Sequence, residues 1–176
     1  ISPFIPAGFY YKTFMWPKSF WKNIYEPLIR KTAGLGKSPT VPDPELYDHR
    51  HAHCDVLIIG GGISGIMSAK LAAKNNFNTI LVDDKNSLGG STIYQNNENF
   101  KIDNNISKNW LTKEIEELSK LKNLKIKVRT SVAAYHSYNY LLAKENLTDH
   151  LSKDNKNISI RQRLWKIRAK KVIIAT

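Results

Sequence analysis

A short run of glycines between two apolar segments constrains the fold of this chain more than any other feature. Four of six consecutive residues are glycine, in the run Gly60-Gly61-Gly62-Ile63-Ser64-Gly65. Residues 56–59 before it are all apolar, as in a strand buried on both faces. We predict a helix over residues 64–75 and a second buried strand over residues 79–82. This strand–helix–strand spacing indicates an α/β fold with a parallel sheet and a crossover helix.

The glycines match the pattern G-x-G-x-x-G, in which each glycine has its own physical task. Gly60 permits a tight turn out of the strand, Gly62 lets a diphosphate approach the backbone, and Gly65 lets the helix lie close to the strand. The start of the helix offers unpaired N–H groups and the positive end of its dipole to that anion. The pattern alone is weak evidence. Because a strand precedes it and a helix follows, it predicts a Rossmann-like FAD/NAD(P)-binding fold.

An acid about twenty residues after the turn is the second sign of a dinucleotide site. Asp83 directly follows the second apolar run, and Asp84 and Lys85 come next. A carboxylate at this position can accept hydrogen bonds from the ribose of adenosine. Two carboxylates would repel a 2′-phosphate, which favours NAD or FAD over NADP, although Lys85 can neutralise one of them. Without the glycines, Asp83 would be an ordinary turn residue.

The rest of the chain predicts further elements around this unit. Gly89, Gly90 and Ser91 would let backbone amides approach a dinucleotide, or would form an ordinary glycine turn. Ser107 can cap a helix over residues 107–122. Further strands are expected as one strand at 124–128, a small antiparallel meander at 131–136, 139–145 and 158–168, and a last buried strand at 171–175.

The N-terminal region differs in character from the rest. It is rich in aromatic residues, and a helix with one apolar face is expected after Pro17, with Pro27 bending or dividing it and Gly34-Leu35-Gly36 ending it. Residues 37–53 are expected to be a connecting loop. We therefore expect an arm and linker over residues 1–53 and a dinucleotide-binding domain over residues 54–176. Because the chain starts at Ile1 and stops on an apolar run, we expect a truncated fragment with an incomplete domain.

Composition narrows the classes of partner. The formal net charge of +12 permits nucleic-acid binding, but the lysines are scattered, so we expect no nucleic-acid partner. The single cysteine, Cys54, suits a reducing cytoplasm. No run approaches the ~20 apolar residues of a membrane span, so no membrane contact is expected. His49, His51 and His53 lie close to Cys54, but with no second ligand cluster we expect a solvated linker and no metal site.

Several runs outside the glycine turn resemble the alpha subunit of heterotetrameric sarcosine oxidase. The arm PAGFYYKTFMWP at residues 6–17 is the most diagnostic, and the likeness covers nearly the whole chain. It continues through Tyr25-Glu26-Pro27-Leu28-Ile29-Arg30, Ala33-Gly34-Leu35-Gly36, His53-Cys54-Asp55-Val56, Thr130-Ser131-Val132, Tyr135, Asn139-Tyr140 and Leu164-Trp165-Lys166-Ile167-Arg168-Ala169.

The resemblance implies an oxidoreductase that demethylates sarcosine to glycine, gives hydrogen peroxide and passes the one-carbon unit to tetrahydrofolate. It implies NAD in this fold. FAD and covalent FMN would belong to the beta subunit or its interface with alpha, and the folate site to a domain outside this chain. The partners implied are the beta, gamma and delta subunits and an amine substrate. This chain alone is expected to lack oxidase activity.

The resemblance also implies contacts to NAD at named positions, which add to those of the glycine pattern. Ile63 and Ser64 stand where proline and alanine are usual in that family, and Lys85 is not the common residue. These departures reduce the support for the contact expected of Ser64. No residue of this chain is expected to be catalytic. The expected cofactor-binding residues are Gly60, Gly62, Ser64, Gly65, Asp83, Asp84, Lys85, Gly90, Ser91 and Val132.

Two alternatives stay open at this point. The first is the alpha subunit of an opine-oxidase-like or related amine dehydrogenase, which would hold FAD in this fold. The second is a structural or binding module without catalysis, whose nucleotide site has decayed. The intact Gly60, Gly62, Gly65 and Asp83 favour a working site over a decayed one.

Overall fold

The structure is a computed structural model that describes residues 17–36, 40–94, 101–103, 105–151 and 159–176. It divides into two compact units, Ile1–Pro44 and Glu45–Thr176. The second unit therefore begins earlier than the predicted boundary between residues 53 and 54. Residues 46–53, which we expected to be loop, belong to its first strand. Most of the aromatic arm, residues 1–16, lies outside the described residues.

The first unit contains a helix in three consecutive segments. Pro27 lies in the first turn of its last segment, and the Glu26 N–H just before it bonds to the carbonyl of Trp21, five residues back. Proline has no N–H to donate and clashes with the preceding turn, so a π-helical turn stands before it. The helix is thus divided near Pro27, as predicted. It ends near Gly34, whose φ is 69°. The segments are α2 (Lys18–Phe20), the π-helical η2 (Trp21–Tyr25) and α3 (Glu26–Thr32).

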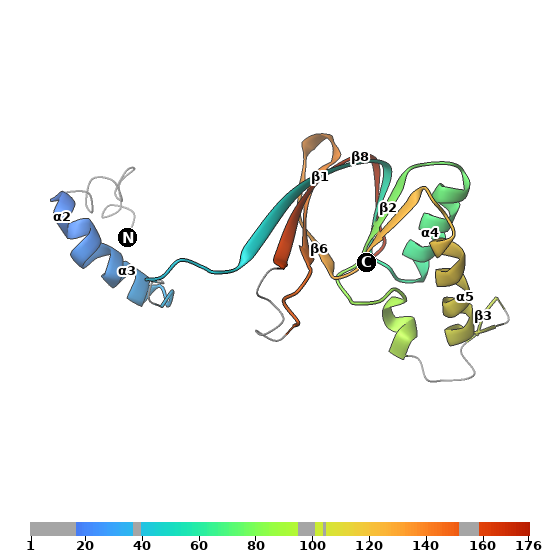
Figure 1. Ribbon diagram of the computed structural model, residues 1–176, viewed down its shortest axis with the longest axis horizontal. Coiled ribbons are helices and arrows are strands. Elements are labelled where there is room, and N and C mark those ends of the chain that lie inside the picture. Colours follow the sequence, from blue (N-terminus) through green and yellow to red (C-terminus); the bar gives the residue numbers. More distant parts are fainter. Residues whose placement is uncertain (1–16, 37–39, 95–100, 104, 152–158) are drawn as a thin grey trace, which may run out of the picture. The chain divides into compact units, whose positions relative to one another are not determined.

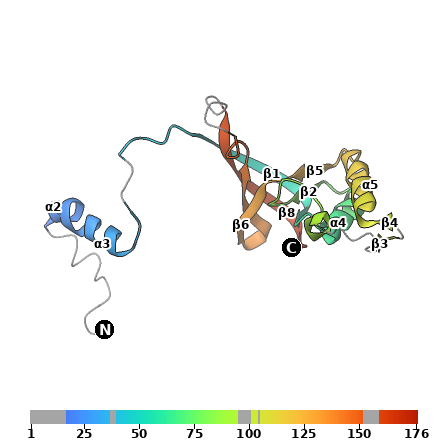
Figure 2. The same ribbon diagram turned by 90° about the horizontal axis from the view of Figure 1, so that it is seen from below.

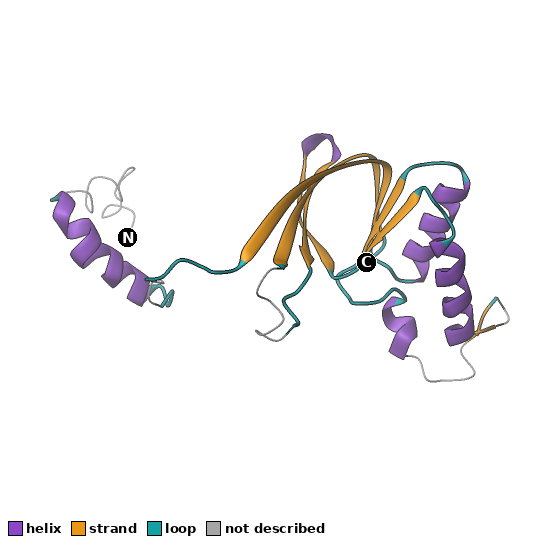
Figure 3. Ribbon diagram, in the orientation of Figure 1, coloured by secondary structure: helices purple, strands orange, loops and turns teal. Residues whose placement is uncertain are grey.

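The second unit is built on a six-stranded sheet in the order β5-β2-β1-β8-β7-β6 (Figures 1 and 3). The first four strands are parallel, and β6, β7 and β8 form the antiparallel meander. The predicted Rossmann-like fold with a parallel sheet and meander is confirmed. The strands are β1 (Leu46–Ile59), β2 (Thr79–Val82), β5 (Leu124–Lys127), β6 (Thr130–His136), β7 (Tyr140–Asn146) and β8 (Ile160–Ile174).

The two longer helices cover one face of the sheet. α4 (Ile63–Lys74) connects β1 to β2, and α5 (Ser107–Ser119) precedes β5 and lies beside α4 (Figure 1). Lys70 of α4 bonds Glu114 of α5 at 2.6 Å. Ser107 is fully buried, and its hydroxyl has no hydrogen-bond partner among the described residues. The prediction that Ser107 caps α5 is wrong, because Ile106 stands at the cap position.

Smaller elements complete the second unit. A 3-10 turn, η3 (Gly90–Tyr94), begins at the second residue of the double glycine, and another, η4 (Ser137–Asn139), joins β6 to β7. A short antiparallel pair, β3 (Lys101–Ile102) with β4 (Asn105–Ile106), stands next to α5 (Figure 2).

β1 and β8 pair along almost their whole length and curve together (Figure 1). In β1, Ala52, Cys54 and Leu57 all face the same core cluster, although side chains of a regular strand alternate with period two. The alternation therefore shifts phase between Cys54 and Leu57. In β8 it shifts in the same way between Ala169 and Val172. The curved strands carry the meander toward the face of the sheet opposite α4, where Leu57 of β1 packs with Leu141 of β7 and Ile167 of β8 (Figure 1).

Candidate functional site

The glycine turn joins β1 to α4, as the sequence predicts. Gly60 has a φ of 107°, and a Cβ there would lie 2.5 Å from the carbonyl oxygen of Ala175, the residue after β8. A Cβ on Gly65 would lie 1.8 Å from the carbonyl oxygen of Gly60. Side chains cannot approach backbone this closely, so the protein's own packing requires glycine at both positions.

Gly62 is a different case. Its φ of −72° and ψ of −172° are open to any residue, and it stands at the N-cap of α4. A Cβ built on it would meet no atom of the described part of the chain within 4 Å. Packing within this unit therefore does not explain a glycine here. The missing side chain leaves open space in front of the helix.

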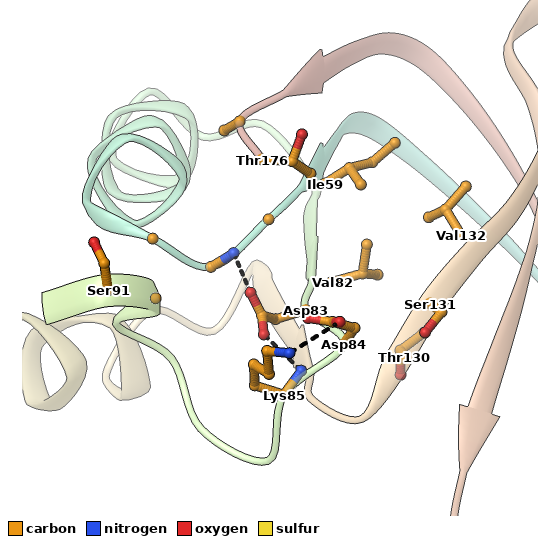
Figure 4. A pocket seen from close by; sticks show the side chains of 15 residues that line it. Ile59, Val82, Asp83, Asp84, Lys85, Ser91, Thr130, Ser131, Val132 and Thr176 are labelled. Atoms are coloured by element: carbon orange, nitrogen blue, oxygen red, sulfur yellow. Dashed lines mark hydrogen bonds and ion pairs between the residues drawn. The ribbon is translucent and has the colours of Figure 1, made fainter. Parts of the chain in front are cut away.

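The open space belongs to a cavity of about 480 Å³. The cavity lies where β1, β2 and β8 end, which is where open parallel sheets bind their ligands. Figure 4 shows residues of these strands and of β6 around it. It is lined by Ile59, Gly60, Gly61, Gly62, Val82, Asp83, Asp84, Lys85, Gly90, Ser91, Thr130, Ser131, Val132, Ala175 and Thr176.

The cavity brings together most of the residues expected from the sequence. Eight of the ten expected residues line it, and the other two, Ser64 and Gly65, lie in the first turn of α4. Sequence reasoning missed Thr130 and Ser131 of β6, which also line the cavity (Figure 4). Their position next to Val132 in the sequence was the available signal. The hydroxyl group of Thr130 donates to the carbonyl of Val128 at 2.9 Å.

Asp83 joins the glycine turn to the loop after β2. Its side chain is buried, and its Oδ2 accepts a hydrogen bond from the Gly61 N–H at 2.5 Å (Figure 4). Its Oδ1 accepts another from the Lys85 N–H at 2.8 Å. An ionised carboxylate has about four acceptor sites, so it can still accept a ribose hydroxyl. Asp83 therefore holds the turn in place whether or not a ligand is bound.

Asp84 and Lys85 present charges at the mouth of the cavity. Their side chains are more than half exposed, and the Lys85 Nζ lies 3.5 Å from Asp84 Oδ2. An exposed pair of this kind is weak and can rearrange around a ligand. The carboxylate of Asp84 is thus available to hydroxyl groups.

The double glycine packs against the glycine turn. The Gly89 N–H donates to the carbonyl of Gly61 at 2.7 Å, and a Cβ on Gly90 would lie 3.2 Å from the Cα of Gly62. Gly90 also has a positive φ of 54°. The backbones of residues 89–91 and 60–62 therefore form one wall, with Ser91 at its edge (Figure 4).

The start of α4 offers hydrogen-bond donors toward the cavity. The helix begins with the bond from the Ile66 N–H to the carbonyl of Gly62, 2.9 Å long. The amide groups before Ile66 have no acceptor within the helix, and they carry the positive end of its dipole. Its first turn holds no acidic residue. This arrangement suits a diphosphate.

The three histidines near Cys54 alternate along β1 and are exposed. The prediction of a linker there is wrong, because these residues pair with β8 in regular register. Within the described ranges, no group of three histidine, cysteine or acidic residues is arranged to hold a metal ion. No helix in the described part of the chain is long and apolar enough to cross a membrane.

Comparison with known proteins agrees with this geometry. Residues 55–175 match the family described as FAD dependent oxidoreductase. The chain belongs to this family. It is also similar to the sarcosine oxidase subunit alpha of Rhizobium meliloti (strain 1021), with 38% identity over 176 residues, covering all of this chain and 17% of the relative. The same subunit of Corynebacterium sp. (strain U-96) is 34% identical over 144 residues, covering 82% of this chain and 15% of the relative.

A solved structure extends the likeness in three dimensions. The L-proline dehydrogenase from P. horikoshii aligns with a TM-score of 0.54 and 26% identity, covering 75% of this chain and 24% of that one. This family member therefore spans only a small part of the oxidoreductases that it resembles. The resemblance to sarcosine oxidase alpha subunits, first seen in the aromatic arm, is confirmed over the full chain.

Proposed function

We propose that this chain is the NAD-binding part of the alpha subunit of a sarcosine oxidase. The observation that carries the proposal is Gly62, where packing within the unit leaves room for a side chain but the sequence has none. A diphosphate that approaches the backbone at the start of α4 accounts for this glycine. The likeness to sarcosine oxidase alpha subunits favours NAD over FAD.

Under this proposal, the cavity binds the pyrophosphate and the adenosine part of the dinucleotide. The pyrophosphate accepts hydrogen bonds from the amides before Ile66, and Gly90 and Ser91 flank it from the other side. The ribose of adenosine donates to Asp83 and Asp84. The remaining contacts are proposed for Ser64, Gly65, Lys85 and, beside the adenine, Val132.

A second candidate is FAD at the same turn, because the matched family is named for FAD. The two are separated by denaturing the purified full-length protein and its complex, one subunit at a time, and identifying the released nucleotide by chromatography and visible absorbance. NAD released from the subunit that carries this chain supports the proposal. FAD released from it supports the alternative, and no nucleotide at all supports a decayed site.

The activity of the whole protein is also proposed. The chain covers 17% of its Rhizobium relative, so the reaction of sarcosine with oxygen, the transfer to tetrahydrofolate and the contacts to beta, gamma and delta subunits rest on the resemblance. We propose a cytoplasmic complex. Sarcosine-dependent peroxide production by the purified complex, with none from this chain alone, is the expected result.

A further inference from the structure

A second cavity, of about 570 Å³, lies beside the first half of β1 and the strand β5. Of the described residues, none lines both this cavity and the one at the glycine turn. Its walls combine apolar and basic side chains, and no described residue that lines it is acidic. They are Arg50, His51, Ala52, His53, Ile80, Lys125, Ile126, Lys127 and Trp165.

Trp165 and Lys127 form the centre of the basic wall. The Lys127 Nζ lies 3.8 Å from the centroid of the Trp165 ring and 3.6 Å from a carboxylate oxygen of Glu145. Glu145 also accepts the indole N–H of Trp165 at 2.6 Å and lies 3.5 Å from Arg163. One carboxylate therefore serves two cations. Burial lowers the pKa of Lys127, and Glu145 offsets only part of this effect, while repulsion from Arg163 and Lys125 adds to it.

Positive charge remains after the local ion pairs are counted. Asp48 lies 2.8 Å from both Arg50 and Arg163. Among the described residues, two carboxylates, Asp48 and Glu145, thus face the three cations Arg50, Arg163 and Lys127. Lys125 is exposed and has no acidic partner in the described part of the chain. The described residues around the cavity therefore carry more positive than negative charge.

We propose that this cavity binds a small organic anion, with a carboxylate or phosphate group and an apolar or aromatic body. The anionic group lies between Lys125 and Lys127, and the body lies against Trp165 and Ile80. A cavity of this size with a few polar groups and apolar walls is typical of a small-molecule site. Solvated lysines alone would not require a tryptophan in the wall or a cavity of this volume.

The proposal is tested on the full-length protein with two probes of the same shape, 2-naphthoate and the uncharged 2-naphthylmethanol. Calorimetric titration is done with and without saturating NAD. We expect naphthoate to bind at least about tenfold more tightly than the alcohol, a difference of about 1.4 kcal/mol. Lys125→Gln should weaken it about fivefold, whereas the matched surface variant Lys108→Gln should leave it unchanged.

The location is checked with a spectroscopic readout that does not depend on calorimetry. Naphthoate should change the tryptophan fluorescence of the wild-type protein, and Trp165→Phe should abolish that change. Equal affinity for both probes, or an unchanged dissociation constant in Lys125→Gln, would overturn the proposal. Competition by NAD would overturn it too, because the anion would then occupy the glycine turn.

Discussion

Substituting Gly62 tests whether this glycine is needed for binding a ligand or for packing within the protein. In Gly62→Ala the new methyl meets no described atom of the protein. The variant should lose only the difference between glycine and alanine at a helix N-cap, about 0.5–1 kcal/mol of the free energy of unfolding. The methyl projects into the place proposed for the pyrophosphate. Losing one charge-assisted hydrogen bond, at about 1.5–3 kcal/mol, should raise the dissociation constant of NAD about 10- to 100-fold.

Gly65→Ala is the matched comparison. Its methyl would lie 1.8 Å from the carbonyl oxygen of Gly60, so α4 or the turn must move. Overpacking of this kind costs about 1–3 kcal/mol. We expect this variant to lose stability and NAD binding together, whereas Gly62→Ala loses binding with little change in stability.

The assay combines calorimetric titration with NAD and urea unfolding of the nucleotide-free protein. Both are carried out on the full-length protein. An unchanged dissociation constant in Gly62→Ala would refute the reasoning, because a pyrophosphate at the proposed place cannot ignore a methyl group. A large loss of stability in the same variant would show that packing, not a ligand, explains the glycine.

Three further results are expected. Asp83→Ala should lower the free energy of unfolding by about 2 kcal/mol in urea titration, because the Gly61 N–H loses its buried acceptor. Asp83→Asn should lower it less, because the amide oxygen can still accept that hydrogen bond. Equal losses of stability in the two variants would contradict this. Lys70→Met should cost roughly 3 kcal/mol by leaving Glu114 buried and unpaired, whereas Lys70→Met with Glu114→Leu should recover most of it in the same assay. Burial raises the pKa of Cys54 to about 11. As the pH rises, the thiol ionises in the unfolded chain before it ionises in the folded one. The free energy of unfolding should therefore fall by up to about 1.4 kcal/mol per pH unit from pH 9 to 11. A Cys54→Ala variant whose free energy of unfolding falls equally steeply over this range would contradict this.

The segment from β1 through α4 to β2 was predictable because the sequence patterns that indicate it are local. The apolar run before Gly60, the helix after it and the acid at Asp83 each follow from a few neighbouring residues, and the structure places them together. The division of the first helix at Pro27 is local as well, since it depends on one missing N–H.

The first half of β1 could not be predicted in the same way. Residues 46–53 are mostly polar, so they lack the apolar pattern by which a strand is recognised. They form a strand because β8, more than a hundred residues later, pairs with them. The same long pairing makes one strand, β8, of the two strands predicted at 158–168 and 171–175. The prediction that Ser107 caps α5 failed for a related reason, because the burial of Ser107 depends on tertiary packing.

The surroundings of Asp83 were predicted only in part. The position of Asp83 at the end of β2 followed from spacing, but its bonds to two backbone N–H groups depend on how the turn folds back. Thr130 and Ser131 line the cavity because β6 lies near β2. In the sequence, their position next to Val132 was the only signal of this.

The most direct test of the central claim is an experimental structure of the full-length protein with NAD bound. The account predicts the pyrophosphate in front of α4, with its oxygens about 2.7–3.2 Å from the amide nitrogens between Gly62 and Gly65. A dinucleotide bound elsewhere on the protein, with this turn in contact only with solvent or with other protein atoms, would contradict it.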